Sequence, residues 1–494
     1  PMSDREPKRR IYIIGAGFTG QTIAKEIRAK GILGTVVAFL DDDPGKIGTR
    51  IEDVPILGPI RDVVQLLRQT PADEALIALP NASREKLREL YTLLKRAGFT
   101  KIRILPGISQ IIEGDAHLIL TRQIHPEDLL ARTPVTINLN KSLEYLRGKR
   151  VLITGAGGSI GSELARQLLS GGAERLYLFG HGENSIYEID RELRMLQEEG
   201  VGEKATIVPV IGDLQDRDYM LFILKRLRAE VVFHCAAYKH VPMMEANPVA
   251  AVKNNIFGTK NLVDAAMEAG TKRFVLISTD KTVEPVSIYG ATKKIAEEIV
   301  LQADGKSRAF MVVRFGNVLG SRGSIVPLFR NQILKGGPVT ITHPEASRFF
   351  MTIPEAASLV LNAGGVGKGG TLYVLDMGEP LFIKELAEQM IRFFGYEPEK
   401  DIPMVTIGLR KGEKLTEALW EPAESIEPTG YPKINRILRN GQVLKGIPEL
   451  LEALKPICFF DPARSDSYRN RKLLRTILQN AIPTLEVPCD EPEY

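Results

Sequence analysis

The sequence predicts an α/β protein with two Rossmann-like, doubly wound parallel sheets. Two apolar segments, RRIYIIG and RVLITG, each run directly into a glycine-rich turn and then into a helical pattern. After each turn, further buried-strand segments alternate with helical ones. A chain of 494 residues is also too long for one ordinary core. We therefore expect at least two domains.

Composition and charge exclude several classes of protein. Charged residues make up 26% of the chain and the net charge is only +4, with the basic residues scattered, so we expect neither disorder nor a nucleic-acid partner. The cysteines and histidines lack the spacing of a disulfide framework or a metal site, so we predict no metal and a cytoplasmic compartment. No apolar run approaches the roughly 20 residues of a membrane-spanning helix.

The first predicted domain covers residues 11–130, after a linker or tag remnant at 1–10. Gly15, Gly17 and Gly20 have the G-x-G-x-x-G spacing, which lets a backbone approach a pyrophosphate at a helix N-terminus. A second apolar run, TVVAFLDDD, ends in acidic residues, and Asp41 is our candidate for a ribose-binding carboxylate. The same pattern is equally compatible with a tight strand-to-helix connection that has lost its ligand. The segments EALIALP, SREKLRELYTLLKRAG and KIRILP complete the α/β unit.

A connector at residues 131–147 leads to the second domain, which we place at 148–440. Gly155, Gly158 and Gly161 follow T-G-x-x-G-x-x-G between a buried strand and a helix. The segments ERLYLFG, ATIVPVIGD, VVFHCAA and RFVLIST supply four more parallel strands.

Ligands of such sheets bind beyond the carboxyl ends of the strands, where we place a nicotinamide dinucleotide. The predicted cofactor-binding residues are Gly155, Gly158, Ser159, Ile160, Gly161, Asp213, Leu214, Ala236, Ala237, Tyr289 and Lys293.

The stretch ISTDKTVEPVSIYGATKK brings candidate catalytic side chains to this edge. Tyr289 and Lys293 are one helical turn apart, so they share a helix face. A free phenol has a pKa near ~10, and a nearby cation lowers it toward that of a usable base. A surface Tyr and Lys on an amphipathic helix is the alternative, which the upstream glycine loop and Thr279 at a strand end disfavour.

Asp280 and Lys281 follow Thr279 directly and suit the elimination of water next to a ketone. Lys281 has to be neutral to remove a proton from carbon, and we expect burial beside Lys293 and a nicotinamide to lower its pKa from ~10.4. Asp280 has to carry a proton to release hydroxide as water. The alternative is an exposed ion pair that caps a turn.

From about residue 10 to 440 the chain resembles the bacterial polysaccharide-biosynthesis nucleotide-sugar 4,6-dehydratases of the UDP-N-acetylglucosamine 4,6-dehydratase group, which are extended short-chain dehydrogenase/reductases. The matching strings include VLITGAGGSIGSEL, VVFHCAAYKHVPMME, NNIFGT, VRFGNVLGSRGSIVPLF, SRFFMTIPEA and GLRKGEKLTE. The resemblance implies a CoA-binding-like first domain, and a small substrate-binding subdomain mainly after residue 315.

The resemblance also implies the reaction. Tyr289 takes the proton of the sugar 4-hydroxyl while Thr279 holds that oxygen, Lys281 removes the carbon 5 proton and Asp280 protonates the departing 6-hydroxyl. UDP-N-acetylglucosamine thereby becomes a UDP-4-keto-6-deoxy sugar for surface polysaccharide or glycan synthesis. The implied substrate-binding residues are Lys239, Asn255, Asn317, Arg348, Arg410 and Glu413. The alternative for each arginine is a solvated surface charge.

The implied cofactor is NAD or NADP, tightly bound and regenerated in each turnover. Gly180 stands where the family has a ribose-binding Asp, although Glu183 is close enough in sequence to replace it. We further expect a homo-oligomer that works at the cytoplasmic face of the inner membrane, with the family's transmembrane helices missing from this chain.

Two alternative functions remain, a UDP-sugar 4- or 5-epimerase and a non-catalytic nucleotide-binding sensor. The first domain lacks a comparable reactive cluster, so we interpret it as a regulatory or positioning module. Residues 441–494 predict helix, loop and helix with a loose acidic end.

Overall fold

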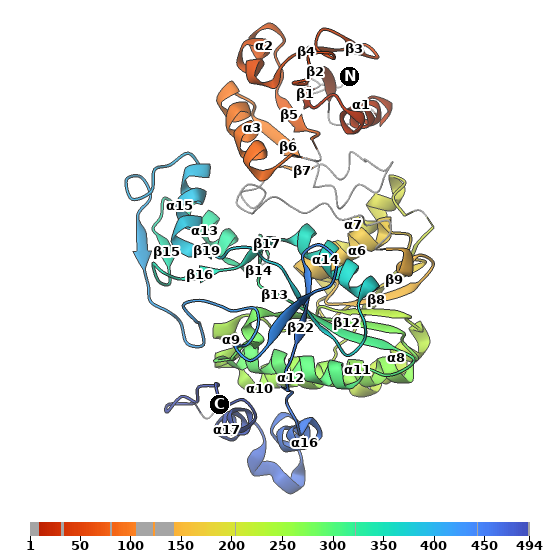
Figure 1. Ribbon diagram of the computed structural model, residues 1–494, viewed down its shortest axis with the longest axis vertical. Helices are drawn as coiled ribbons and strands as arrows, with labels where there is room; N and C mark the ends of the chain where they lie inside the picture. The colour runs from red at the N-terminus through yellow and green to blue at the C-terminus, as the bar shows by residue number, and fades with distance from the viewer. Residues whose placement is uncertain are drawn as a thin grey trace, which may run out of the picture. The chain divides into compact units, whose positions relative to one another are not determined.

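The computed structural model describes residues 9–30, 34–79, 82–104, 122–123, 143–202, 204–321, 323–441 and 443–492 (Figure 1). The chain divides near residue 137 into two compact units, each with its own sheet. Most of the predicted 131–147 connector, the predicted domain end at 130 and most of the 1–10 segment lie outside the described residues.

The first unit is a seven-stranded sheet in the order β3-β4-β2-β1-β5-β6-β7. Its central strand β1 pairs in parallel with β2 and β5, as the alternation of strands and helices predicts. The strands are β1 (Arg10–Ile14), β2 (Thr35–Leu40), β3 (Arg50–Ile51), β4 (Val54–Gly58), β5 (Glu74–Ile77), β6 (Lys101–Ile104) and β7 (Arg122–Gln123). The helices are α1 (Phe18–Lys30), η1 (Ile60–Asp62), α2 (Val63–Gln69) and α3 (Arg84–Ala97).

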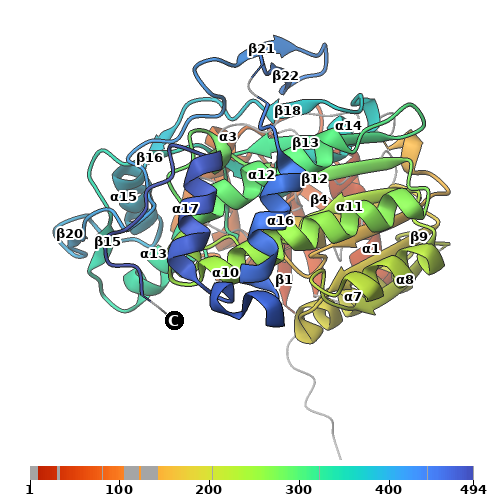
Figure 2. The same cartoon turned by 90° about the horizontal axis from the view of Figure 1, so that it is seen from below.

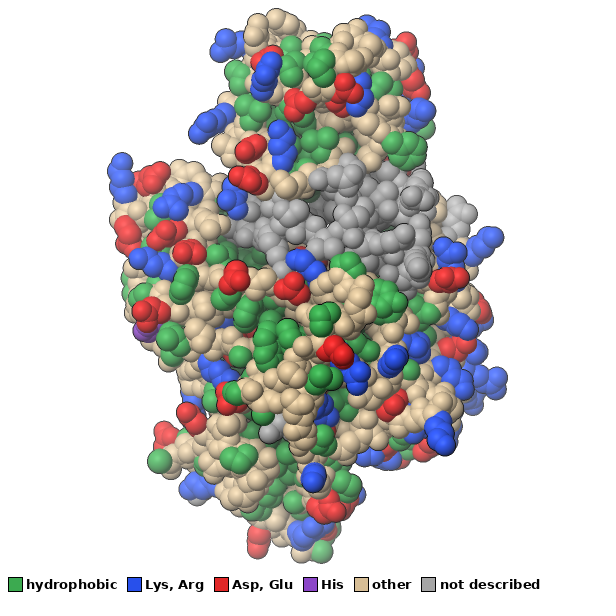
Figure 3. All heavy atoms as spheres, in the orientation of Figure 1, with side chains coloured by type: hydrophobic (Ala, Val, Ile, Leu, Met, Phe, Trp, Pro, Cys, Tyr) green, Lys and Arg blue, Asp and Glu red, His purple; other side chains and the backbone are tan. Residues whose placement is uncertain are grey.

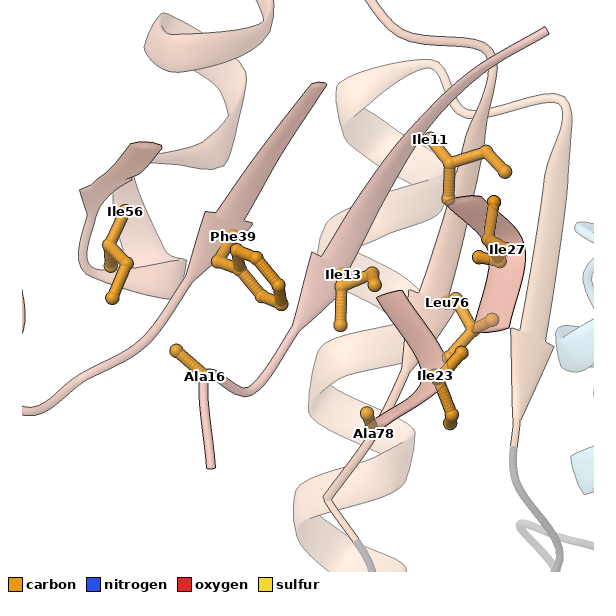
Figure 4. Packing of buried hydrophobic residues seen from close by; sticks show 9 residues of the cluster. All are labelled: Ile11, Ile13, Ala16, Ile23, Ile27, Phe39, Ile56, Leu76 and Ala78. Atoms are coloured by element: carbon orange, nitrogen blue, oxygen red, sulfur yellow. The ribbon is translucent and has the colours of Figure 1, made fainter. Parts of the chain in front are cut away.

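The core of the first unit forms between α1 and the sheet (Figure 4). Ile23 and Ile27 are one turn apart on α1, so both side chains face the sheet. They pack with Ile11 and Ile13 of β1, which share one face because side chains alternate along a strand. This packing fixes the N-terminus of α1 beside the end of β1, where the first glycine loop lies.

The second unit has a nine-stranded sheet in the order β10-β9-β8-β11-β12-β13-β18-β22-β21. All pairs from β10 to β18 are parallel, and β22 and β21 add an antiparallel edge. The strands are β8 (Arg150–Thr154), β9 (Arg175–Gly180), β10 (Thr206–Ile211), β11 (Val231–His234), β12 (Arg273–Thr279), β13 (Ala309–Phe315), β18 (Leu372–Leu375), β21 (Ser425–Pro428) and β22 (Ile434–Leu438). The predicted α/β fold is thereby confirmed.

Helices cover both faces of this sheet, with α6 and α14 on one side and α8, α11 and α12 on the other (Figure 1). These helices are α6 (Ser159–Ser170), α7 (Glu183–Glu198), α8 (Arg217–Leu227), α11 (Gly258–Glu268), α12 (Ile288–Gln302) and α14 (Ile353–Val366). Shorter elements of this unit are η4 (Glu144–Leu146), which precedes β8, and α9 (Val241–Ala246), α10 (Pro248–Ala251), the π-helical turn η5 (Val252–Phe257) and η6 (Asp280–Thr282).

A group of small elements follows β13, where we expect the substrate subdomain. It contains three two-stranded sheets, β14-β17, β15-β20 and β16-β19. The elements are β14 (Asn317–Leu319), α13 (Ile325–Leu334), β15 (Val339–Ile341), β16 (Ser347–Arg348), β17 (Phe350–Thr352), β19 (Leu381–Phe382), α15 (Ile383–Phe393) and β20 (Met404–Thr406).

The C-terminal segment forms α16 (Ile447–Cys458), η7 (Pro462–Ser467) and α17 (Arg471–Ala481). Both helices lie across α10, and α16 also contacts α12 (Figure 2). The sequence predicts that the acidic C-terminal end is loose. This prediction is wrong as far as Glu491, because the Glu491 carboxylate is buried between Arg471 and Arg475. This segment is therefore packed onto the second unit.

Side chains of both charges are interspersed on the face of the molecule drawn in Figure 3. None of the helices in the described part of the chain is both long and apolar enough to cross a membrane.

Candidate active site

The glycine loop between β8 and α6 has the shape that a dinucleotide pyrophosphate requires. Gly155 has φ +64°, and a Cβ there would lie 2.8 Å from the Ala236 backbone at the end of β11. A Cβ on Gly161 would lie 2.2 Å from the Gly155 carbonyl oxygen. Gly158 caps α6, and its N–H donates to the Gly155 carbonyl at 2.9 Å. Between Gly155 and the helix N-terminus the loop therefore carries no side chain larger than the methyl group of Ala156, which fits a bound phosphate pair.

The other predicted cofactor residues lie at neighbouring strand ends. Ser159 and Ile160 open α6, and Ala237 follows β11. Asp213 is exposed after β10 and accepts the Gln215 N–H at 2.9 Å, whereas Leu214 is buried. Gly180 ends β9, and the exposed Glu183 begins the next helix, so both lie at this edge of the sheet.

The end of β12 and the turn η6 hold three of the predicted catalytic residues in one hydrogen-bonded group. The Thr279 hydroxyl donates to Asp280 Oδ1 at 2.9 Å, and the Lys281 amine donates to the same oxygen at 3.0 Å. Lys281 also donates to Asn317 Oδ1 at 3.2 Å. Asp280 is 0% exposed, so the alternative of a solvated surface ion pair is wrong.

Tyr289 and Lys293 lie on the first turns of α12, and both are buried. Burial raises the pKa of the Tyr289 phenol to about 12, against the opposing effects of the Lys281 charge and the Thr279 hydroxyl. The Lys293 amine donates to the Ile277 carbonyl at 2.7 Å, and burial lowers its pKa to about 8. We expected a lowered pKa for the Tyr289 phenol, but in this arrangement its pKa is raised.

The expected lowering of the Lys281 pKa is also wrong. Burial does act in that direction, but the carboxylates of Asp280 and Glu417 outweigh it and raise the pKa of Lys281. A charged Lys281 is thus the resting form, and it must pass a proton on before it can act as a base.

Glu417 is a site residue that the sequence analysis missed. Its side chain is 4% exposed and lies 3.9 Å from the Lys281 amine, and burial raises its pKa. It is the last residue of GLRKGEKLTE, the string in which we selected Arg410 and Glu413 instead. The only sequence signal was its place in that string, because the fold alone brings residue 417 beside the end of β12.

The predicted substrate residues divide into two groups. Asn317 joins the hydrogen-bonded group at the end of β12 through its contact with Lys281. Partial burial, and then the charge of Lys281, lower the pKa of Lys239. Arg410 and Glu413 lie in one loop, where the Arg410 N–H donates to Glu413 Oε2 at 3.1 Å.

Asn255 and Arg348 make contacts with the protein instead. Asn255 is buried in η5, and its side chain bonds to both backbone groups of Tyr238 and to the Thr292 hydroxyl, so the predicted substrate contact is wrong. The Arg348 guanidinium donates to the carbonyls of Ser347, Lys414 and Leu415. Arg348 thereby fixes the segment that carries Glu417.

In the first unit, Asp41 lies beside the glycine loop as expected, but its carboxylate accepts the Ala16 N–H at 2.7 Å. A Cβ on Gly20 would lie 2.0 Å from the Gly15 carbonyl oxygen, whereas a Cβ on Gly17 meets nothing within 4 Å. The loop is therefore tightly packed against α1, and one of its amides already binds an anionic group. In the parts of the chain that the structure describes, no three His, Cys, Asp or Glu side chains are grouped to hold a metal ion.

A family profile described as polysaccharide biosynthesis protein matches residues 151–439, which is more than half of the chain. The chain belongs to this polysaccharide biosynthesis family. Residues 3–106 match a CoA-binding domain. The probable polysaccharide biosynthesis protein EpsC of Bacillus subtilis is 44% identical over 428 residues, covering 86% of this chain and 71% of EpsC.

Two further relatives of this polysaccharide biosynthesis protein each cover somewhat more than half of the chain. The UDP-N-acetylglucosamine 4,6-dehydratase (inverting) of Campylobacter jejuni serotype O:23/36 is 32% identical over 283 residues, covering 56% of this chain and 79% of that protein. The X-ray structure of Pen from Bacillus thuringiensis superimposes with a TM-score of 0.53 at 33% identity, covering 59% of this chain and 88% of Pen. The family resemblance drawn from the sequence is confirmed.

Proposed function

We propose that this protein dehydrates a UDP-linked amino sugar, UDP-N-acetylglucosamine in the first instance, to a UDP-4-keto-6-deoxy sugar with the help of NAD or NADP. The observation that carries the proposal is the pair of Asp280 and Lys281, whose charged groups are 3.0 Å apart at the same strand end as Thr279. The Asp280 side chain is 0% exposed and that of Lys281 is 20% exposed. An oxidation and reduction at carbon 4 needs no such pair, whereas elimination of water needs an acid and a base. The C. jejuni relative with a dehydratase name supports the same choice.

The glycine loop and Lys293 would hold the cofactor. A nicotinamide dinucleotide supplies the acceptor, and later the donor, of the hydrogen that carbon 4 gives up. Gly155 and Gly161 leave room for its pyrophosphate at the N-terminus of α6. Lys293, once charged, attracts the phosphates and stabilises a phenolate on the same helix face.

The side chains of this chain move the protons. Tyr289 accepts the proton of the 4-hydroxyl, which leaves a ketone at carbon 4 and makes the carbon 5 hydrogen acidic. Lys281 removes that carbon 5 proton, and Asp280 protonates the 6-hydroxyl as it departs. The 3.0 Å contact between Lys281 and Asp280 permits one proton to pass directly from amine to carboxylate, giving the neutral base and the protonated acid together.

The test is incubation of the whole chain with UDP-N-acetylglucosamine and NAD in deuterated water, followed by proton NMR. We expect the hydroxymethyl signal to give way to a 6-methyl signal. Asp280→Asn and Lys281→Met should remove this product. Lys225→Met should not, because Lys225 lies in an exposed ion pair with Glu268. An intact hydroxymethyl group with altered carbon 4 geometry would mean an epimerase, and no conversion would mean a nucleotide-binding sensor.

A further inference from the structure

Glu417 is a buried carboxylate beside the proposed base. Its side chain is 4% exposed, and its Oε2 accepts no hydrogen bond within the described residues. The amines of Lys281 and Lys414 each lie 3.9 Å from one of its oxygens, which is beyond hydrogen-bonding distance. We propose that Glu417 accepts a hydrogen bond from the 6-hydroxyl of the bound hexose and so holds the group that leaves as water. The proposal rests on the dehydration proposed above.

Asp280 has an oxygen in the same condition. Its Oδ1 accepts hydrogen bonds from Thr279 and Lys281, but its Oδ2 is buried and has no donor within the described residues. Buried carboxylate oxygens are rarely left without a donor in folded proteins, because the lost hydration is then not replaced. Two such oxygens, one on each acidic neighbour of the Lys281 amine, are therefore available to the donors of a ligand.

The backbone on both sides of Glu417 fixes its position. Before it, the Lys414 amine donates to the carbonyl of Val283 at 2.7 Å, and Val283 directly follows the turn η6. After it, the Arg314 guanidinium of β13 donates to the carbonyl of Leu419 at 3.1 Å. The Glu417 carboxylate is thus held near Lys281 without hydrogen bonds of its own, so its acceptor positions stay open.

The 6-hydroxyl is the donor that this position fits best. Lys281 removes the carbon 5 proton in the proposed reaction, and carbon 6 is bonded to carbon 5. Asp280, which protonates the 6-hydroxyl, lies 3.0 Å from the same amine. A hydroxyl can accept one hydrogen bond and donate its own hydrogen to a second group. The 4-hydroxyl gives its proton to Tyr289, and the other donors of the amino sugar are more bonds away from carbon 5.

This contact helps the hydroxyl to leave. The electron pair of the carbon 5–hydrogen bond forms the double bond between carbons 5 and 6. The bond from carbon 6 to oxygen breaks, its electron pair stays on oxygen, and this oxygen takes the proton of Asp280. Glu417 neither gains nor loses a proton. Because Glu417 accepts the hydroxyl hydrogen, the 6-oxygen becomes a stronger acceptor toward Asp280. The water that forms is still hydrogen-bonded to Glu417.

The experiment measures the binding of two ligands that cannot react. UDP-4-deoxy-4-fluoro-N-acetylglucosamine has no 4-hydroxyl to oxidise, and its 6-deoxy counterpart also lacks the 6-hydroxyl. Their affinities are compared by calorimetry in the wild-type protein, in Glu417→Met and in the control Glu421→Met. Glu421 lies further along the same segment, but it forms its ion pair with Lys294 of α12. Thermal unfolding shows whether each variant is folded, and Glu417→Ala replaces Glu417→Met if the latter is not.

We expect the wild-type protein and Glu421→Met to prefer the 6-hydroxy ligand by about 10- to 100-fold, as for a hydrogen bond to a charged group. Glu417→Met should reduce this preference about tenfold, by weakening the binding of the 6-hydroxy ligand. An equal preference in the wild-type protein and Glu417→Met would overturn the contact alone. Absence of the 6-methyl product in the NMR assay of the wild-type protein would instead overturn the dehydration, and the role of Glu417 with it.

Discussion

Replacing Arg475 by methionine should destabilise the second unit strongly, although Arg475 lies on the C-terminal helix α17. The Arg475 side chain is 0% exposed. Its Nη1 lies 3.0 Å from Glu245 Oε2, its Nη2 donates to the Glu245 carbonyl at 2.9 Å, and its Nε lies 2.6 Å from Glu491 Oε2. Methionine fills much of the same volume but leaves two buried carboxylates with one cation fewer.

The expected cost follows from what remains of this network. Removing one partner of a buried ion pair costs about 3–5 kcal/mol. Glu491 keeps a contact with Arg471 at 2.6 Å, and Glu245 Oε1 still accepts the Ile288 N–H at 2.7 Å. We therefore expect the lower value, about 3 kcal/mol, which corresponds to a fall of roughly 5 °C in the melting temperature of a unit this large.

The assay is thermal and urea unfolding of the whole chain, with Lys225→Met as the matched control. Lys225 and Glu268 are 2.8 Å apart, but their side chains are 57% and 48% exposed, so this loss should cost less than about 1 kcal/mol. Equal effects of Arg475→Met and Lys225→Met would refute the reasoning. Because Glu245 holds the first residue of α12, next to Tyr289, Arg475→Met should also lower kcat below the melting transition, with partial recovery in Arg475→Lys.

Three further predictions concern the glycine loops and α12. Gly161→Ala should destabilise its unit by about 1–3 kcal/mol, because the new Cβ would lie 2.2 Å from the Gly155 carbonyl oxygen. Gly17→Ala is the control and should leave the melting temperature unchanged, because no atom lies within 4 Å of its Cβ. Equal shifts would contradict this. NAD binding, measured by equilibrium dialysis, should weaken as the pH rises through about 8, because Lys293 then loses its charge. The Lys293→Met variant should bind NAD weakly at every pH. A pH-independent affinity in the wild-type protein would speak against that role. Tyr289→Phe should lower kcat in the NMR assay by about 10²–10⁴-fold with unchanged NAD affinity, and near-normal turnover would exclude the phenol as the base.

Local signals in the sequence were sufficient to predict the two sheets and the glycine loops. Apolar strands, positive-φ glycines and helix starts are properties of short segments, so each can be recognised without the rest of the chain. The grouping of the candidate catalytic residues was predictable for the same reason. Thr279, Asp280 and Lys281 are consecutive, and Tyr289 and Lys293 share a helix face.

Contacts between distant segments could not be predicted in this way. Glu417 reaches Lys281 across 136 positions, and it helps to reverse the direction of the Lys281 pKa that burial alone implies. Asn255 matched a family string, yet only the packing of η5 shows that its amide is already occupied by Tyr238 and Thr292. Each of these outcomes depends on long-range packing, which a periodic pattern does not encode.

Both outer strands of the nine-stranded sheet contain a proline, Pro209 in β10 and Pro428 in β21. Proline has no N–H to offer a further strand, and it is tolerated in sheets almost only at such borders. Proteins commonly use this device to prevent unwanted strand-to-strand association between molecules. If copies of this chain assemble, extending the sheet from one molecule into the next is thus disfavoured, and helical surfaces are the better candidates for their contact.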